Sequence, residues 1–334
     1  MKSHVELKYI TLVQIVGCCL VILGHSFPFV TAYPSAVKVC IHFLYTFHMP
    51  LFVWCSGFLL ALTMQSDRMS TAKYARKRAV KLLVPYFVIS LIGLIPKLLA
   101  SSVLNDNLNM DAVSIIRAFL VPRECVWGHF WFLPMILLIG ILGFMVEKFS
   151  KKTTVWIMVV LASFALSFYQ NDVLQWFAIN DVLQFFMFFA AGVLCCRFTN
   201  NINFCHWSYI GSALLLSLVL FFSITSNALL IHTRDTLIAA LMIFVIVQLC
   251  KKFDNSINVN RNSLIAQTYQ IFILSWPCQL VAGIVIERIL ILSWMAFIPI
   301  VFATGIVAPL ILLKLTDWLE LKTHTRYISF LLGR

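Results

Sequence analysis

Long apolar stretches, separated by short polar connections, make up almost the whole chain. A helix needs about 20 mostly apolar residues to cross a hydrocarbon core of about 30 Å. Ten stretches approach that length, so the pattern predicts an all-α integral membrane protein, a single bundle of about ten transmembrane helices. The segment 171–180 is short and mixed in character, which leaves nine or eleven spans as alternatives. The ten stretches lie near residues 10–31, 38–64, 82–101, 128–147, 153–170, 181–197, 206–225, 235–250, 263–287 and 292–315.

Composition agrees with this pattern and excludes a soluble protein. Hydrophobic residues account for 61% of the chain and charged residues for only 11%, and the mean hydropathy is +0.94. An ordinary soluble domain carries about 25% charged residues. No long polar linker interrupts the chain, so we expect one transmembrane domain over residues 1–334. The 10 cysteines are scattered without metal-ligand spacing, and we expect no metal site.

The distribution of lysine and arginine predicts the orientation in the membrane. If the N-terminus is cytosolic, 19 of the 25 basic residues fall on cytosolic segments. Cytosolic loops are the ones that carry an excess of lysine and arginine. We therefore expect both termini in the cytosol. Most of the net charge of +12 reflects this bias, and we expect no nucleic-acid partner.

An ionisable residue, His25, lies within the first apolar stretch, where burial is costly unless the side chain faces a cavity. Gln14 precedes it by 11 residues, which places both about 20° apart on one helical face and about 16 Å apart along the axis. This polar stripe is typical of a cavity lining. Alternatively, His25 bonds a neighbouring helix and serves packing alone.

A second histidine, His48, lies at a similar expected depth in the next stretch. Two imidazoles on helices adjacent in sequence can line one cavity. Pro50 and Gly57 are expected to break or thin this helix, which is tolerated where a cavity supplies partners for the freed carbonyls. The alternative is an ordinary proline kink beside a packing histidine.

A basic cluster follows the second stretch, in a segment that we expect to be a cytosolic loop. Arg78 and Lys81 are three residues apart and would share one face of any helix there. The cluster suits a ligand with several phosphates, although a topology signal with lipid headgroup contacts is the simpler interpretation. Its members are Arg68, Lys73, Arg76, Lys77, Arg78 and Lys81.

Aromatic residues crowd the beginning of the fourth stretch, around His129 and Trp131. An aromatic belt at the membrane interface explains the tryptophans but not the histidine. Upstream, residues 112–120 are expected to form a short helix along the membrane surface.

These motifs occur together in a recognisable order. The first motif is a basic residue followed, after ten residues, by a histidine; His25 matches the histidine, and Gln14 stands in the basic position. The second motif is Phe-x-Met-Pro before Ser-Gly, and the third is Arg-x-x-Arg before Pro-Tyr. The fourth motif is His-x-Trp-Phe-Leu. The matching residues are Phe47, Met49, Pro50, Ser56 and Gly57; Arg78, Lys81, Pro85 and Tyr86; and His129, Trp131, Phe132 and Leu133. Over nearly its whole length the chain resembles acyltransferase family 3, the integral-membrane acyltransferases that modify surface glycans.

The resemblance implies transfer of an acyl group, usually acetyl from acetyl-CoA, to a sugar hydroxyl in the bacterial cytoplasmic (inner) membrane. Acyl-CoA would be a substrate, with no permanently bound cofactor, and the acceptor a glycan, possibly lipid-linked. Lacking a nucleophile motif, the chain favours direct transfer, although covalent transfer through a histidine or Ser56 stays open. The expected catalytic residues are His25 and His48; the donor would bind Arg76, Arg78 and Lys81; and the acceptor cavity would include Gln14, Ser56, His129 and Trp131.

Two departures from the family pattern leave alternatives. Gln14 cannot supply the charge of a basic residue, and Ser275-Trp276-Pro277 stands where many relatives carry histidine before proline. A divergent acceptor or an inactive relative would account for both. Outside the family, a transporter or flippase for an anionic or lipid-linked substrate would use the same cavity, and a scaffold subunit would need no His25.

The topology makes a direct prediction. Reporters fused after Ser150 and Asn255 should read cytosolic, and a reporter fused after Asn107 should read extracytoplasmic. A reversed pattern at two of these three positions would contradict the orientation, and with it the cytosolic placement of the basic cluster.

Overall fold

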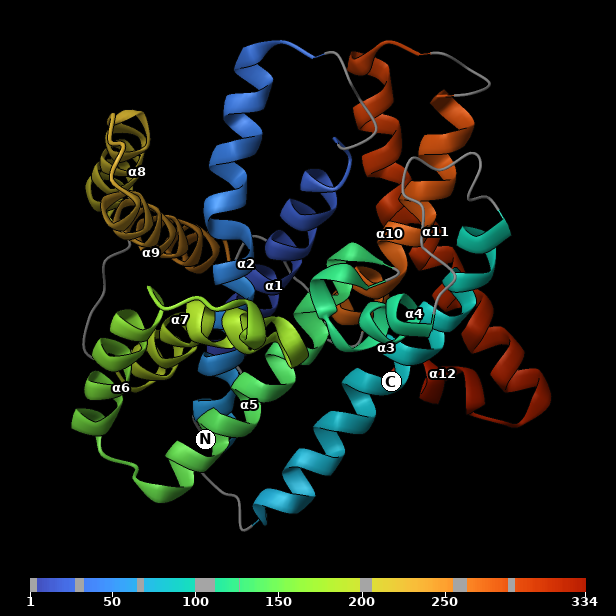
Figure 1. The fold of residues 1–334 in the computed structure, drawn as a ribbon, viewed down its shortest axis with the longest axis horizontal. Coiled ribbons are helices and arrows are strands. Elements are labelled where there is room, and N and C mark those ends of the chain that lie inside the picture. Colours follow the sequence, from blue (N-terminus) through green and yellow to red (C-terminus); the bar gives the residue numbers. More distant parts are fainter. Residues whose placement is uncertain are drawn as a thin grey trace. The chain divides into compact units, whose positions relative to one another are not determined.

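The structure is a computed structural model that describes residues 5–27, 33–64, 69–99, 112–125, 127–198, 206–254, 263–287 and 292–334. Within these ranges the regular structure is helical throughout (Figure 1). Arg68 and two of the reporter positions, Asn107 and Asn255, lie outside the described residues.

A helix covers each of the ten apolar stretches. These helices are α1 (Val5–Gly24), α2 (Ser35–Thr63), α3 (Thr71–Leu99), α5 (Phe132–Phe149), α6 (Thr153–Leu166), α7 (Ile179–Phe198), α8 (Trp207–Phe222), α9 (Ala228–Phe253), α10 (Thr268–Val285) and α11 (Trp294–Thr323). The shorter elements are α4 (Ala112–Leu120), η2 (Pro122–Glu124), η3 (Gly128–Trp131), η4 (Asp172–Ala178), η5 (Leu264–Ala266) and α12 (Tyr327–Leu331). The short helix expected at 112–120 is therefore confirmed as α4.

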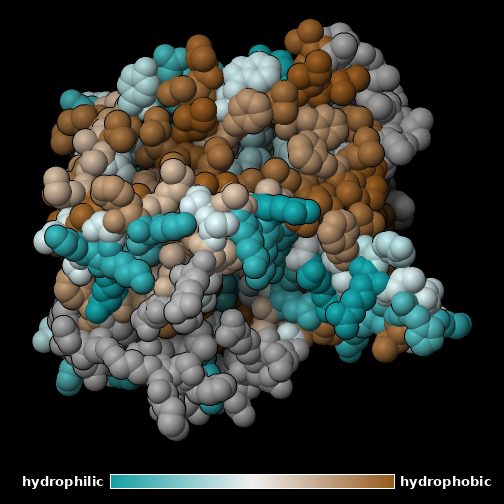
Figure 2. All heavy atoms as spheres, turned by 90° about the horizontal axis from the view of Figure 1, so that it is seen from below, coloured by the Kyte–Doolittle hydropathy of each residue, from teal (hydrophilic) through white to brown (hydrophobic). Residues whose placement is uncertain are grey.

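Among the described residues, six helical segments are long and apolar enough to cross a membrane. They are α2, 128–149, 172–198, α9, α10 and α11, and three shorter apolar helices lie at 8–24, 153–166 and 207–222. Many apolar side chains face outward, such as Met158 on α6 and Leu215 on α8. Figure 2 shows broad apolar areas beside gathered hydrophilic side chains, as expected of a surface that contacts lipid. The chain is an all-helical integral membrane protein, and the count of ten spans stays a prediction.

One compact unit comprises Met1–Leu59 and Gly192–Leu313. In it α1 packs against α9 and α10, and α8 packs against α9 (Figure 1). Most of its buried residues are aliphatic or aromatic, with Val13, Val21 and Ile273 almost fully enclosed.

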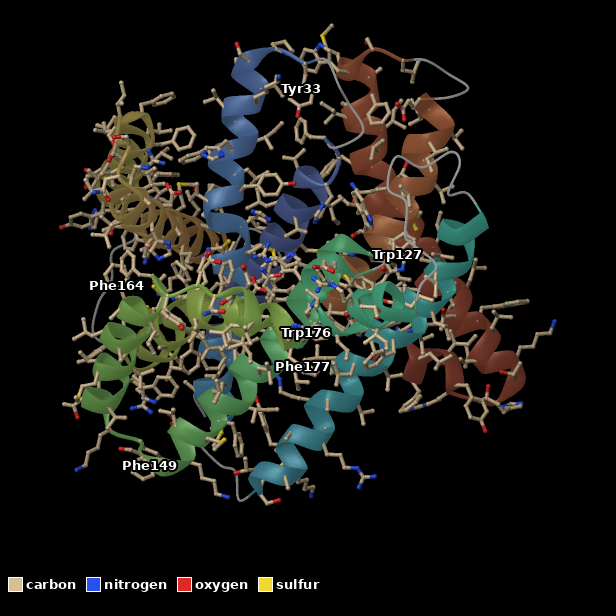
Figure 3. All side chains as sticks on the ribbon, in the orientation of Figure 1. Tyr33, Trp127, Phe149, Phe164, Trp176 and Phe177 are labelled. Atoms are coloured by element: carbon tan, nitrogen blue, oxygen red, sulfur yellow. The ribbon has the colours of Figure 1, made fainter. Side chains whose placement is uncertain are left out.

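A second compact unit comprises Leu60–Ala191 and Lys314–Arg334. Here α3 packs against α5, while η2 lies against α4, η3 and η4. The Trp127 indole (Figure 3) donates its Nε1 hydrogen to the Ile89 carbonyl of α3 at 2.8 Å. The Trp156 indole donates to the buried carboxylate of Glu147 at 2.8 Å, which joins α6 to α5.

Three details differ from the sequence-based expectations. The basic cluster was expected in a loop, but helix α3 begins at Thr71 and includes Arg76, Arg78 and Lys81, because arginine, lysine and alanine all favour helix. Helix α1 ends at Gly24, so His25 lies in the turn that follows. Helix α2 continues through Pro50 and Gly57 without the expected break.

The mixed segment 171–180 also has a physical explanation. Phe177 and Ala178 adopt left-handed backbone conformations, with φ of 58° and 63°. Such values are uncommon for residues with a side chain. They separate the 3-10 turns of η4 from α7 and account for the interrupted apolar pattern there.

Candidate functional site

His25 lies half-buried in the turn that follows α1. Its backbone N–H still bonds the Val21 carbonyl at 3.0 Å, so the turn prolongs the helical path. Its imidazole lies against the Trp276 indole of α10, with ring centroids 5.1 Å apart and planes at 60°. An aromatic ring at this distance and tilt restricts how the imidazole can rotate.

A closed hydrogen-bond network holds the same turn. The Ser26 hydroxyl donates to the Ile22 carbonyl at 2.9 Å. The Gln279 side-chain amide of α10 donates to that carbonyl at 2.8 Å and to the Ser26 Oγ at 2.9 Å. Because a carbonyl only accepts, the amide nitrogen must face Ile22. Both hydrogens of the amide nitrogen are thereby used.

His48 is buried on α2, and the structure determines which of its nitrogens carries hydrogen. Its Nδ1 lies 3.0 Å from the Leu44 carbonyl. Since that oxygen only accepts, Nδ1 must be the donor, and in the neutral ring Nε2 then has a free lone pair. This tautomer is able to accept a proton at Nε2.

Tyr45 connects the two histidines. Its hydroxyl donates to the Gly24 carbonyl at 3.1 Å, immediately before His25. Its ring meets the His48 imidazole edge to face, with centroids 4.9 Å apart. Tyr45 thus links the turn that carries His25 to the imidazole of His48 within one compact unit. That the two imidazoles line one cavity stays a prediction.

Ser56 and Gln14 belong to the same compact unit. The Ser56 hydroxyl donates to the Phe52 carbonyl of its own helix at 3.1 Å. A serine bonded in this way is not activated as a nucleophile, which requires a neighbouring base. Gln14 lies half-buried on α1, about three helical turns before His25.

The basic cluster belongs to the other unit, and its member Arg78 is held by side-chain contacts. Its Nη1 donates to the Tyr74 hydroxyl at 3.1 Å, and the Tyr74 ring stacks on Phe144 of α5 at 4.1 Å. The guanidinium also lies against Gly140, where an added Cβ would come within 2.9 Å of Nε. Among the described residues its buried Nε has no hydrogen-bond partner. A cation bonded only to a neutral hydroxyl is available to an anion.

Arg78 and Lys81, three residues apart, form the basic face of α3, and Arg76 adds a further charge elsewhere on the same helix. The side chains of Lys81 and Arg76 are exposed. Lys81 lies just outside the apolar stretch that begins at residue 82. Loss of hydration lowers its pKa from the ordinary value, and the positive charges of Arg78 and Lys77 lower it further. Such crowding of like charges is relieved when an anion binds.

His129 and Trp131 lie on η3. His129 is buried with its ring 4.5 Å from that of Phe130. Trp131 has Arg123 over its face at 4.3 Å and Phe185 at 5.6 Å. Arg123 is in turn bonded through Nε to the buried Asp181 at 2.9 Å. Trp131 is therefore packed between these side chains within its own unit, and the acceptor contact of Trp131 and His129 stays a prediction.

The sequence analysis missed Gln279 and Tyr45 at the histidines and Tyr74 beside Arg78. It noted Trp276 only as part of a departure from the family pattern. Gln279 carried a usable signal, a strongly polar residue within an apolar stretch, by the same reasoning that singled out Gln14. Among the described residues no group of three or more histidine, cysteine, aspartate or glutamate side chains is arranged to hold a metal ion.

Comparison with known proteins gives one match. A family model described as an acyltransferase domain matches residues 7–314. No curated protein and no solved structure matches the chain.

The tautomer of His48 can be tested directly. In ¹⁵N spectra of histidine-labelled protein we expect protonated Nδ1 and unprotonated Nε2, because Nδ1 donates to Leu44. The His48→Gln variant identifies the resonances. An Nε2-protonated ring in the resting protein would contradict the hydrogen bond.

Proposed function

The chain belongs to acyltransferase family 3, and from that premise we propose that it is a membrane O-acyltransferase acting on a cell-envelope glycan. The donor is an acyl-CoA, acetyl-CoA in the first place, and the acceptor is a sugar hydroxyl, possibly on a lipid-linked precursor. The protein works in the bacterial cytoplasmic membrane.

The observation that supports the proposal is His25 beside Trp276, with Tyr45 joining the His25 turn to the imidazole of His48. His25 takes the proton of the acceptor hydroxyl as that oxygen attacks the thioester carbonyl carbon. A carbon–oxygen bond forms, the carbon–sulfur bond breaks, and the proton passes to the departing CoA thiolate. General-base assistance of this kind contributes about 10²–10⁴-fold to a rate.

His48 has a complementary role in this scheme. With Nδ1 bonded to Leu44, its Nε2 can accept a hydrogen bond but donates none. It is therefore suited to orient the acceptor hydroxyl, and less suited to polarise the thioester carbonyl. The back-bonded Ser56 favours direct transfer over a covalent serine intermediate.

The basic face of α3 is proposed to bind the phosphates of the donor. Tyr74, itself stacked on Phe144, holds the Arg78 guanidinium before any ligand arrives. Pre-ordering of a side chain lowers the entropy lost on binding. Lys81 and Arg76 add charge on the same helix, as the 3′-phosphate and pyrophosphate of CoA require.

The reaction class can be tested in cells without knowing the acceptor. The envelope glycans of cells with and without the gene are compared by mass analysis. We expect an acyl mass, about 42 Da for acetyl, that disappears when the gene is absent. A transporter or flippase would instead change how much glycan is exported while leaving its acylation intact.

Replacement of His25 separates catalysis from packing. We expect purified His25→Gln to lose at least about 100-fold in transfer rate while retaining near-normal abundance, because glutamine keeps hydrogen bonding but accepts no proton. His25→Ala should be equally inactive. The measurement is transfer of radiolabelled acetyl from acetyl-CoA to the envelope glycan fraction of cells lacking the gene.

The matched control is His42→Gln. His42 is exposed on α2 and stacks on Phe221 with ring centroids 5.6 Å apart. We expect this variant to keep full activity. If His25→Gln stays within about threefold of the parent protein, the proposed mechanism is wrong and a packing role for His25 is sufficient.

Arg78 tests the donor site. We expect Arg78→Ala to raise the KM for acetyl-CoA by about 5- to 100-fold, since hydrogen bonds to charged groups contribute about 1–3 kcal/mol. Arg78→Lys should recover part of that loss, because lysine keeps the charge but not the planar fork. Lys73→Ala, on the exposed first turn of the same helix, is the control. An unchanged KM in both Arg78 variants would leave the cluster as a topology signal only.

A further inference from the structure

Helix α10 contacts the His25 turn at two points that lie on one face. Trp276 and Gln279 are three residues apart, so their side chains project in similar directions from the helix. Trp276 meets the imidazole itself, while Gln279 binds the backbone carbonyl of Ile22 and the hydroxyl of Ser26 on either side. The turn is thereby fixed from two directions.

Gln279 is enclosed completely, with no exposed surface. A buried amide is favourable only when it is hydrogen-bonded. Its nitrogen is fully used, whereas its Oε1 has no hydrogen-bond partner among the described residues. The side chain therefore forgoes part of its own hydrogen bonding while holding the turn. A leucine or methionine would fill this place at lower cost if packing were its only task.

A third helix braces the amide from behind. Gly305 of α11 approaches so closely that an added Cβ would lie 2.8 Å from Gln279 Cδ and 2.6 Å from Ile22 Cγ2. Real Cβ atoms do not approach other heavy atoms this closely, so any larger residue would displace the amide or the end of α1. Glycine at this position allows α11 to hold Gln279 against the turn.

We propose that Gln279, braced by Gly305, is the positioning residue that fixes the His25 turn so that the imidazole meets the acceptor hydroxyl. This inference rests on the proposed role of His25 as general base. It assigns Gln279 no contact with substrate. A displacement of about 1 Å in a reacting group can lower a rate about 100-fold. The rate of acyl transfer should therefore depend on how firmly the turn is held.

The test compares two pairs of variants in the acetyl-transfer assay, with acetyl-CoA as donor and the glycan fraction of cells lacking the gene as acceptor. Gln279→Met is matched by Gln270→Met, which removes a buried amide from the same helix away from His25. Gly305→Ala is matched by Gly211→Ala, where an added Cβ meets nothing within 4 Å.

We expect the kcat of Gln279→Met to fall about 10- to 100-fold, with the KM for acetyl-CoA within about threefold of the parent. Gly305→Ala should have the same effect as Gln279→Met, a lower kcat with a nearly unchanged KM. This second variant keeps the test decisive if Gln279→Met fails to fold. Gln270→Met should lower the thermal midpoint by as much as Gln279→Met while keeping kcat within about threefold. If Gln279 had only a structural role, equal losses of stability would bring equal losses of kcat.

Two results would overturn the inference without touching the proposed function. One is a kcat for Gln279→Met equal to that of Gln270→Met while His25→Gln is inactive. The other is a loss of activity in Gly305→Ala that only follows the loss of folded protein. If His25→Gln itself remains active, the proposed function fails first and the positioning role fails with it.

Discussion

The structure depends on one constraint, that polar groups within hydrocarbon must find their partners inside the protein. The apolar helices obey it locally, since the hydroxyls of Ser56, Ser163 and Ser275 each donate to a carbonyl of their own helix. Where a helix ends, local partners run out. At the end of α1 the Ile22 carbonyl receives Gln279 from another helix. The polar residues that join helices therefore gather at a helix end, and in this chain that end carries His25.

The sequence predicts the kind and approximate place of every long helix, because about 20 apolar residues leave few alternatives in a membrane. It places their ends poorly wherever charged residues continue the helix. Helix α3 begins at Thr71 although its apolar stretch begins near residue 82. Hydropathy reports contact with lipid, whereas arginine and lysine extend a helix outside the lipid without any apolar signal. The residues proposed to bind the donor thus lie on a helix and not in the expected loop.

The candidate site is predictable in its residue types and not in its pairings. His25 and His48 stand out because titratable residues are rare within apolar stretches. Trp276 and Gln279 lie about 250 residues further along, and helical periodicity gives the face of a residue but not the helix that the face meets. Trp131 shows the same limit. Its motif gave no sign that Arg123 covers its ring or that Asp181 of α7 binds that arginine, and its contact with the acceptor stays a prediction.

The hydrogen bond between His48 and Leu44 has a consequence for proton movement across the membrane. A proton that reaches Nε2 of this ring can continue only if Nδ1 releases its own hydrogen, and that hydrogen is committed to a carbonyl of the same helix. The His48 imidazole can therefore receive a proton at Nε2 but cannot relay it onward through Nδ1. In the proposed transfer, a proton taken up at Nε2 of His48 would then have to leave again from the same nitrogen. A carrier in the same fold that was driven by protons would have to break this bond in every cycle.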